Sequence, residues 1–292
     1  MHIIGHSKII NFLDRYIRRN STSAAYLFFG VEHLGKFTLA LDFAKKITGQ
    51  QERHINPDII IIRPESEEKK GVIKKKDIKI GQVREMQKEL SLTPYFGKCK
   101  VAIIDDAERL TVAAQNALLK ILEEPDSRSI LILVCHNQEK ILPTIKSRSV
   151  IKNFNAVSPE EIALSYSDGE MSQAAIFWSL GRPGLAIEFA AHPEKLQALE
   201  KNRAELVQIF QDNLVDKFFL AEGLAKNVSE LKDKLQSWVV LLRQNMMSQG
   251  NFLGVPLEKT LAIMEGITES LKLIQETNSN PRVVVENLLL KF

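Results

Sequence analysis

The sequence predicts an α/β domain with a parallel sheet and flanking helices, followed by domains that are helical throughout. Short apolar runs alternate with amphipathic stretches up to about residue 154, and the pattern beyond that point is nearly all helical. The first apolar run leads into a glycine-rich loop and then a helix, which is the setting of a phosphate-binding loop. These observations predict a nucleotide-binding α/β layer with helical domains after it.

Runs rich in Val and Ile are the candidate strands of this layer. They cover residues 26–29, 58–63, 101–105 and 130–135. Because the runs are apolar without alternation, they fit strands that are buried on both faces of a parallel sheet. Amphipathic segments at 38–47 and 111–122 supply crossover helices between them.

Composition describes a protein with a sizeable core and a modest charge. The chain has 292 residues, 45% hydrophobic and 26% charged, with a formal net charge of +3. This length is enough for two or three domains, and the charge is too small for a stand-alone nucleic-acid binder of the strongly basic kind. The start of the chain lacks a charged leader with an apolar core, and no apolar run reaches bilayer length, so we expect a cytoplasmic protein without membrane contact.

The sequence contains two cysteines, Cys99 and Cys135. They are too few for a four-ligand zinc site or a disulfide framework. We therefore expect reduced, mostly buried thiols and no metal site.

The phosphate-binding loop runs from Gly30 to Phe37. In such a loop the backbone amides cradle phosphates, the lysine reaches the β- and γ-oxygens, and a hydroxyl residue after the lysine holds Mg²⁺. Gly30, Gly35 and Lys36 keep their positions, but Phe37 stands where the hydroxyl belongs. Thr38 comes one residue later, where a helix turns the side chain by roughly 100°. We expect weak nucleotide binding or none, and loss of ATP hydrolysis.

Two carboxylates follow the candidate strand at 101–105. In phosphate-loop ATPases the first acid at this place supports Mg²⁺ and the second orients the attacking water. Asp105 and Asp106 hold these positions. Asp106 is one methylene shorter than the glutamate usually found there, which weakens activation of the water.

Other segments organise the rest of the chain. The mixed-charge stretch at 65–79 predicts an exposed hairpin or loop, more in keeping with a solvated surface than with a nucleic-acid site. Ser158 and Pro159 predict a helix start, and the sequence from Gly181 to Gly184 predicts a break between helices. Further helices are expected at 194–211, 214–225, 229–248, 256–276 and 281–291.

Several motifs together resemble those of bacterial clamp-loader subunits, which are AAA+ proteins. They are the run 116–125 (NALLKILEEP), the segment 142–149 (LPTIKSRS), Ile4-Gly5-His6, the segment 90–94 and Gly181-Arg182-Pro183-Gly184. The similarity covers the N-terminal two-thirds of the chain and is greatest to the delta-prime type of DNA polymerase III subunit. The C-terminal bundle matches only in helical character.

The resemblance implies an architecture and a set of partners. It implies an AAA+ domain at residues 1–156, a helical lid at 157–193 and a C-terminal collar at 194–292 that joins a subunit ring. The partners would be gamma/tau-like motor subunits, a delta-like subunit, the sliding clamp and primed DNA. In this role the chain would help to load the clamp during DNA replication, and no intrinsic ATPase activity is expected.

The resemblance also assigns roles to single residues. Arg148 matches the arginine of the family's Ser-Arg-Cys motif, which acts as a finger on ATP bound by the neighbouring subunit, although Ser149 replaces the cysteine. The helix at 111–122 would face the central chamber, which places Lys120 near DNA.

Departures from the family pattern favour a subunit without hydrolysis. Active relatives carry a polar sensor near Cys135 and an arginine where Gly184 stands, and Phe37 and Asp106 weaken two further pieces of the site. No zinc is expected, because the four-cysteine module common in the family is missing after the first helix. No cofactor is required for the predicted role, and ATP or ADP would bind weakly at most.

Two alternatives stay open. One is an active, ATP-hydrolysing motor subunit of the gamma/tau kind that uses Thr38 and Asp106 in place of the missing groups. The other is a nucleic-acid-binding accessory protein that acts alone through lysines at 69–79 and 98–100. The modest net charge disfavours the second.

Overall fold

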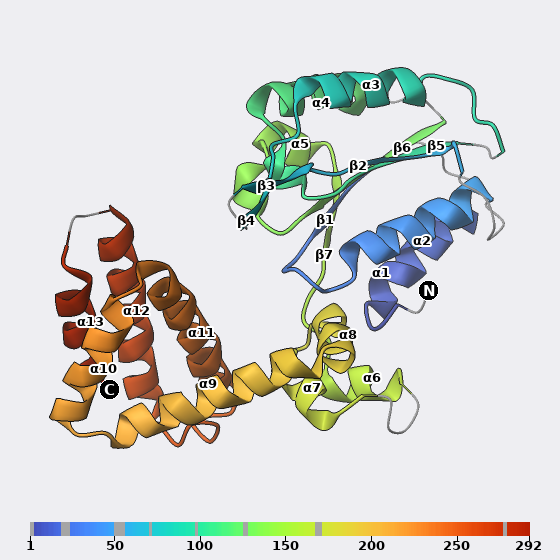
Figure 1. Ribbon diagram of the computed structural model, residues 1–292. Coiled ribbons are helices and arrows are strands. Elements are labelled where there is room, and N and C mark those ends of the chain that lie inside the picture. Colours follow the sequence, from blue (N-terminus) through green and yellow to red (C-terminus); the bar gives the residue numbers. More distant parts are fainter. Residues whose placement is uncertain are drawn as a thin grey trace. The chain divides into compact units, whose positions relative to one another are not determined.

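The chain folds into two compact units, Met1–Ala190 and Ala191–Phe292, which are described separately (Figure 1). The computed structural model describes residues 3–18, 24–49, 56–69, 72–96, 99–124, 128–166, 171–276 and 279–292.

The first unit is built on a five-stranded parallel sheet in the order β2-β5-β6-β1-β7. Its strands are β1 (Ala24–Phe29), β2 (Ile59–Ile62), β5 (Lys100–Ile104), β6 (Ser129–Cys135) and β7 (Val150–Asn153). Every residue of β5 and β6 is buried, as expected for central strands covered on both faces. This confirms the predicted fold class and the predicted strand positions.

Helices cover both faces of the sheet (Figure 1). On one face, α1 (Ser7–Arg18) and α2 (Lys36–Thr48) pack on alternate strand residues such as Val101 and Ile103. On the other, α3 (Ile80–Leu90), α4 (Val112–Glu123) and α5 (Pro143–Ser147) pack on the intervening residues, among them Ala102 and Ile104. Because alternate side chains of a strand point to opposite faces of the sheet, the apolar residues of β5 contribute to both hydrophobic cores.

The edge strand β7 is not among the predicted strands. It has four residues, and Val150 and Ile151 are 41% and 40% exposed, so the apolar run that identified the buried strands is missing here. The predicted hairpin at 65–79 is confirmed in the described residues by β3 (Ser66–Lys69), which pairs antiparallel with β4 (Val72–Lys75).

The end of the first unit is a group of short helices, α6 (Pro159–Leu164), α7 (Gln173–Trp178) and α8 (Pro183–Ala191). The predicted helix start is confirmed, because the Ser158 hydroxyl accepts the Glu161 N–H at 3.1 Å. The Val157 N–H donates to the Gly181 carbonyl at 2.8 Å, which ties the break between α7 and α8 to the chain leaving the sheet.

The second unit is helical in all its regular elements. They are α9 (Pro193–Gln211), α10 (Leu214–Ala225), α11 (Val228–Met247), α12 (Leu257–Glu276) and α13 (Pro281–Leu289). These bounds agree with the predicted helices to within two residues. The side chain of Trp238 is fully buried and its ring lies tilted against that of Phe292, with 5.5 Å between ring centroids. Phe292 in turn stacks on Phe210 at 5.2 Å between ring centroids. None of the described helices is long and apolar enough to cross a membrane.

Both cysteines are free and fully buried, which confirms the predicted state of the thiols. Burial, followed by the charge of Asp58, raises the pKa of Cys99 to about 11. We expect the native chain to react negligibly with a thiol reagent at pH 8, since only about one Cys99 side chain in a thousand is then a thiolate. Ellman titration should count two thiols in denaturant and almost none without it; rapid reaction of the native chain would contradict this burial.

Candidate nucleotide pocket

The predicted functional residues meet at one edge of the sheet because three neighbouring parallel strands end there. β6 lies between β1 and β5, with Phe29 opposite Cys135 and Leu133 opposite Ile104. The phosphate-binding loop leaves β1, the acidic residues follow β5, and His136 follows β6. Ligands of open α/β sheets commonly bind outside such carboxyl ends.

A pocket of about 400 Å³ lies at this edge. Most of the predicted nucleotide-binding residues line it: Gly35, Lys36, Thr38, Asp105 and Asp106, with Phe37, Cys135 and Gly184 from the departures described above. Gly30 begins the same loop, and its N–H donates to the Cys135 carbonyl at 3.3 Å.

Lys36 is 7% exposed and holds the loop closed on itself. Its Nζ donates to the carbonyls of Gly30 and Val31, both at 2.6 Å. Burial lowers the pKa of Lys36, against the opposing effects of Cys135 and the nearby carboxylates. The lysine is thus placed as in a phosphate-binding loop, with its ammonium group bonded to loop carbonyls.

Phe37, the residue after the loop lysine, makes a cation–π contact with Arg63. The guanidinium carbon of Arg63 lies 4.0 Å from the centre of the Phe37 ring, and Arg63 Nε lies 3.4 Å from Asp105 Oδ2. A cation over an aromatic face is attracted by the ring quadrupole. Arg63 therefore contacts both Phe37 and Asp105, and it was not among the predicted site residues.

The acidic pair is contacted by two basic residues, Arg63 just after β2 and Lys75 at the end of β4. Asp106 Oδ2 accepts from Lys75 Nζ at 2.5 Å, and Asp106 has a left-handed backbone, with φ of 50°. Burial, followed by the charge of Asp106, raises the pKa of Asp105, while Arg63 acts in the opposite direction. Asp105 and Asp106 therefore occupy their predicted places but face side-chain cations.

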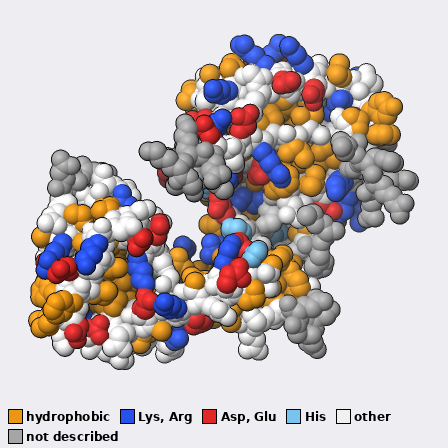
Figure 2. Space-filling view, viewed as in Figure 1, with side chains coloured by type: hydrophobic (Ala, Val, Ile, Leu, Met, Phe, Trp, Pro, Cys, Tyr) orange, Lys and Arg blue, Asp and Glu red, His pale blue; other side chains and the backbone are white. Residues whose placement is uncertain are grey.

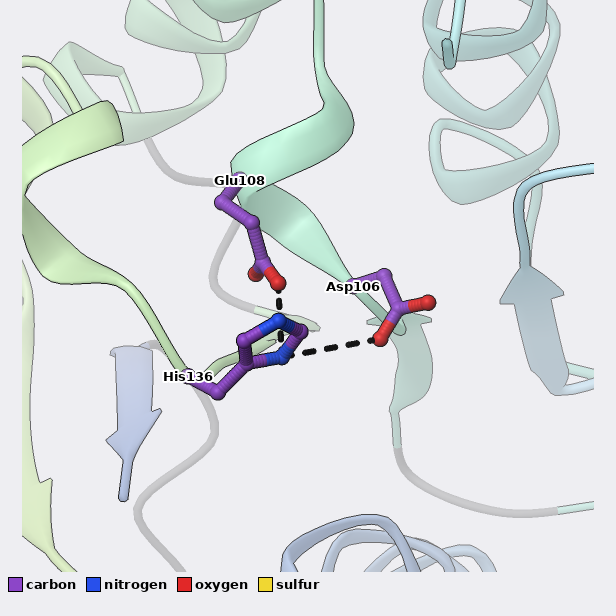
Figure 3. Close-up of side chains that lie close together, drawn as sticks. All are labelled: Asp106, Glu108 and His136. Atoms are coloured by element: carbon purple, nitrogen blue, oxygen red, sulfur yellow. Dashed lines mark ion pairs between the residues drawn. The ribbon is translucent and has the colours of Figure 1, made fainter. Parts of the chain in front are cut away.

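A third carboxylate, Glu108, lies beside His136 and near Asp106 (Figure 3). Glu108 comes from η1 (Ala107–Arg109), and His136 comes between β6 and η2 (Gln138–Lys140). Glu108 Oε1 lies 2.7 Å from His136 Nδ1, and Asp106 Oδ1 lies 3.9 Å from the same nitrogen. The Glu108 side chain is 4% exposed. Glu108 is not among the predicted site residues; its place two residues after Asp106 is the sequence signal that could have identified it.

The α8 helix is hydrogen-bonded to the phosphate-binding loop through its backbone. The Gly184 N–H donates to the His33 carbonyl at 2.8 Å, and His33 has φ of 64°. A Cβ at position 184 would lie 3.0 Å from that carbonyl oxygen. This close approach favours glycine at position 184.

Arg148 is not among the described residues that line the pocket. It ends α5, is 40% exposed, and its Nη2 lies 3.1 Å from Glu123 Oε1. Nη1 also donates to the Thr144 carbonyl at 3.5 Å. The arginine therefore faces the surface beside the end of α4.

The predicted DNA-facing Lys120 is exposed on α4 and borders a surface groove with Arg84 and Lys88 of α3.

The lysines at 69–79 and 98–100, which the stand-alone nucleic-acid-binding alternative would use, do not form a free basic patch in the described residues. Lys100 is 6% exposed inside β5, Lys75 pairs with Asp106, and Lys76 lies near Glu65 and Glu67. Lys98 is outside the described residues. Including Lys100 in an exposed patch was therefore wrong, because it belongs to a central strand.

Comparison with known proteins gives the family. The family described as "DNA polymerase III, delta subunit" matches residues 5–158, just over half of the chain. The chain belongs to the DNA polymerase III delta-prime family. It is thereby a clamp-loader family member, as the sequence motifs predicted.

Among curated relatives, the delta-prime family member of Pseudomonas aeruginosa is 34% identical over 142 residues, 43% of this chain and 41% of that protein. The one from Escherichia coli is 36% identical over 138 residues, 45% and 39% of the two chains. Replication factor C small subunit of Methanococcus maripaludis is 30% identical over 168 residues, 57% and 49%. The chain thus spans less than half the length of each of these relatives.

Solved structures agree with the AAA+ fold of a delta-prime family member. A DNA polymerase III gamma subunit-related protein from Thermotoga maritima has a TM-score of 0.52 and 22% identity, and covers 96% of this chain and 97% of its own. RuvB from the same organism has a TM-score of 0.50 and 16% identity, covering 98% and 87%. At these identities the likeness bears on the fold alone.

Proposed function

We propose that this chain is a delta-prime-like clamp-loader subunit that does not hydrolyse ATP itself. The observation that carries the proposal is the arrangement of Arg63, which lies over Phe37 and beside Asp105. Mg²⁺ in a phosphate-loop site needs the hydroxyl and the acid that these two positions supply in active enzymes. Here an aromatic ring replaces the hydroxyl and a guanidinium neutralises the acid. ATP or ADP is accordingly expected to bind weakly, and no cofactor is required.

The same subunit would lend Arg148 to the ATP site of a neighbouring motor subunit. A finger in trans must lie on the surface and outside its own nucleotide site. Arg148 is 40% exposed and its ion pair with Glu123 is a surface pair, since Glu123 is 53% exposed. Such a pair is weak, so the guanidinium can leave it for a phosphoryl group at little cost in free energy.

The helical second unit would serve as the collar that joins the subunits. α10 exposes Leu214, Val215, Phe218 and Phe219, which are 57%, 61%, 40% and 70% exposed and recur at helical spacing. Figure 2 shows hydrophobic side chains gathered over this part of the second unit. A contiguous exposed apolar patch is typical of an interaction surface. Its partners would be gamma/tau-like motor subunits and a delta-like subunit, within an assembly that places the sliding clamp on primed DNA.

Phosphate release by the purified chain tests this proposal. We expect ATP turnover by the wild-type chain with Mg²⁺ to equal that of the Lys36→Ala variant, because neither assembles a hydrolytic site. The gamma/tau-like motor alternative draws support from Thr38, which lines the pocket with Lys36 and Asp105. It predicts the opposite result, namely Mg²⁺-dependent turnover that Lys36→Ala abolishes, and that result would overturn the proposal.

A further inference from the structure

Glu108 is a buried carboxylate that faces the imidazole of His136. Neither Oε1 nor Oε2 has a hydrogen-bond partner among the described residues, and the side chain is 4% exposed. Burying an ionised carboxylate costs several kcal/mol unless it is paired with a cation or coordinates a metal. This buried carboxylate therefore requires a partner, which the His136 imidazole or a bound cation can supply.

The three basic side chains nearest the pocket, Lys36, Arg63 and Lys75, each contact groups other than Glu108. Lys36 Nζ bonds to two loop carbonyls, Arg63 lies beside Asp105, and Lys75 bonds to Asp106 Oδ2. The group that faces Glu108 is the imidazole of His136, with Nδ1 at 2.7 Å from Oε1. A neutral imidazole nitrogen and a carboxylate oxygen are both good ligands for a transition-metal ion.

Asp106 completes a convergent set of donors. It uses Oδ2 for Lys75, while Oδ1 faces His136 Nδ1 at 3.9 Å. One donor atom from each of Asp106, Glu108 and His136 lies within 4.8 Å of the others, and Figure 3 shows both carboxylates directed at the imidazole. We call these three residues the acid–histidine cluster.

We propose that the acid–histidine cluster binds a divalent transition-metal ion such as Zn²⁺. Two ligands of one tetrahedral zinc ion lie about 3.3 Å apart when each bond is about 2.0–2.1 Å. The separations of 2.7 and 3.9 Å lie on either side of that value, so small side-chain adjustments bring all three donors to one ion. The His136 side chain is 35% exposed and lines the pocket, which provides an entry path and leaves coordination positions for water or phosphate.

The ligand set differs from that of a Mg²⁺–nucleotide site. Mg²⁺ prefers oxygen ligands and keeps several waters, whereas imidazole favours Zn²⁺ and related ions. The sequence offered no cysteine or histidine spacing for metal, because the ligands come from segments that only the pairing of β5 with β6 brings together. The inference concerns the chain alone and does not depend on the proposed role in an assembly.

Calorimetric titration of the tag-free, chelator-treated full chain with ZnCl₂ tests the site, with MgCl₂ as the comparison ion. We expect saturable Zn²⁺ binding, with Mg²⁺ unable to compete at equal concentration. The variants Glu108→Gln and His136→Gln should each weaken it by more than about tenfold, since loss even of outer partners of a metal ligand costs 10–100-fold.

Matched controls come from the second unit, where His192 Nδ1 pairs with Glu194 Oε1 at 3.1 Å on the surface. His192→Gln and Glu194→Gln should leave the affinity unchanged. Equal Zn²⁺ binding by Glu108→Gln and His136→Gln would overturn the site. Absence of Zn²⁺ binding by the wild-type chain would also overturn it, and the contact between Glu108 and His136 would then be a direct ion pair. Circular dichroism checks that each variant is folded. If Glu108→Gln is unstable, His136→Gln still tests the site, because the His136 side chain is partly exposed.

Discussion

If Arg148 acts as the proposed finger, replacing it with alanine is expected to suppress ATP turnover at the neighbouring motor site by about 10³-fold or more. The guanidinium would stabilise charge that develops on the transferred phosphoryl group, an interaction that is strongest in the transition state. The lone variant should keep its stability, because Arg148 is exposed and its contacts with Glu123 and Thr144 lie at the surface. Phosphate release by a mixture of this chain, its host's motor subunits, clamp and primed DNA measures the effect.

Two matched variants separate a finger from a loss of positive charge. Arg15 is an exposed arginine that donates to the Asn11 carbonyl of its own helix at 3.1 Å, much as Arg148 donates to Thr144. Arg15→Ala should leave turnover unchanged, and so should Glu123→Gln, which removes only the ion-pair partner of Arg148. If the mixture with Arg148→Ala turns over ATP as fast as the wild-type mixture, the chain lends no arginine.

The sequence predicted those parts of the pocket that depend on local pattern. The loop from Gly30 to Lys36 and the acids after β5 are contiguous motifs, and each follows a run of apolar residues that specifies a buried strand. Because parallel strands end at one sheet edge, knowing the strands was enough to expect Lys36 and Asp105 near one another. The helical unit was equally accessible, since apolar residues recur there with a period of 3.6.

Contacts that depend on strand order were beyond sequence reasoning. Arg63 reaches Phe37 and Asp105 because β2 pairs with β5, and His136 reaches Glu108 because β6 pairs with β5. No spacing along the chain encodes these neighbours. β7 escaped notice for a different reason: an exposed edge strand of four residues buries too little surface to require an apolar run.

The largest loss of stability is expected from Gly181→Ala, at the joint between the sheet and the short helices. Gly181 has φ of 72°, and an added Cβ would lie 2.6 Å from the Val157 carbonyl oxygen and 2.9 Å from the Ala156 Cβ. The left-handed backbone costs about 1–2 kcal/mol for a residue with a side chain, and forcing packed backbone apart adds about 1–3 kcal/mol. The variant should therefore lose about 2–5 kcal/mol of the free energy of unfolding.

Gly49→Ala supplies the control that isolates the steric part. Gly49 has φ of 71°, almost the same backbone, but a Cβ there would meet no atom of the described residues within 4 Å. It should lose only the left-handed cost, about 1–2 kcal/mol. Urea titrations followed by circular dichroism and by tryptophan fluorescence compare the two variants. The fluorescence combines Trp178, which is buried in α7, with Trp238, which is buried in α11. A larger loss of stability for Gly181→Ala would show that close packing against Val157 and Ala156 requires glycine at this joint. Equal losses would mean that these contacts adjust at no cost in free energy and that close packing does not hold the joint.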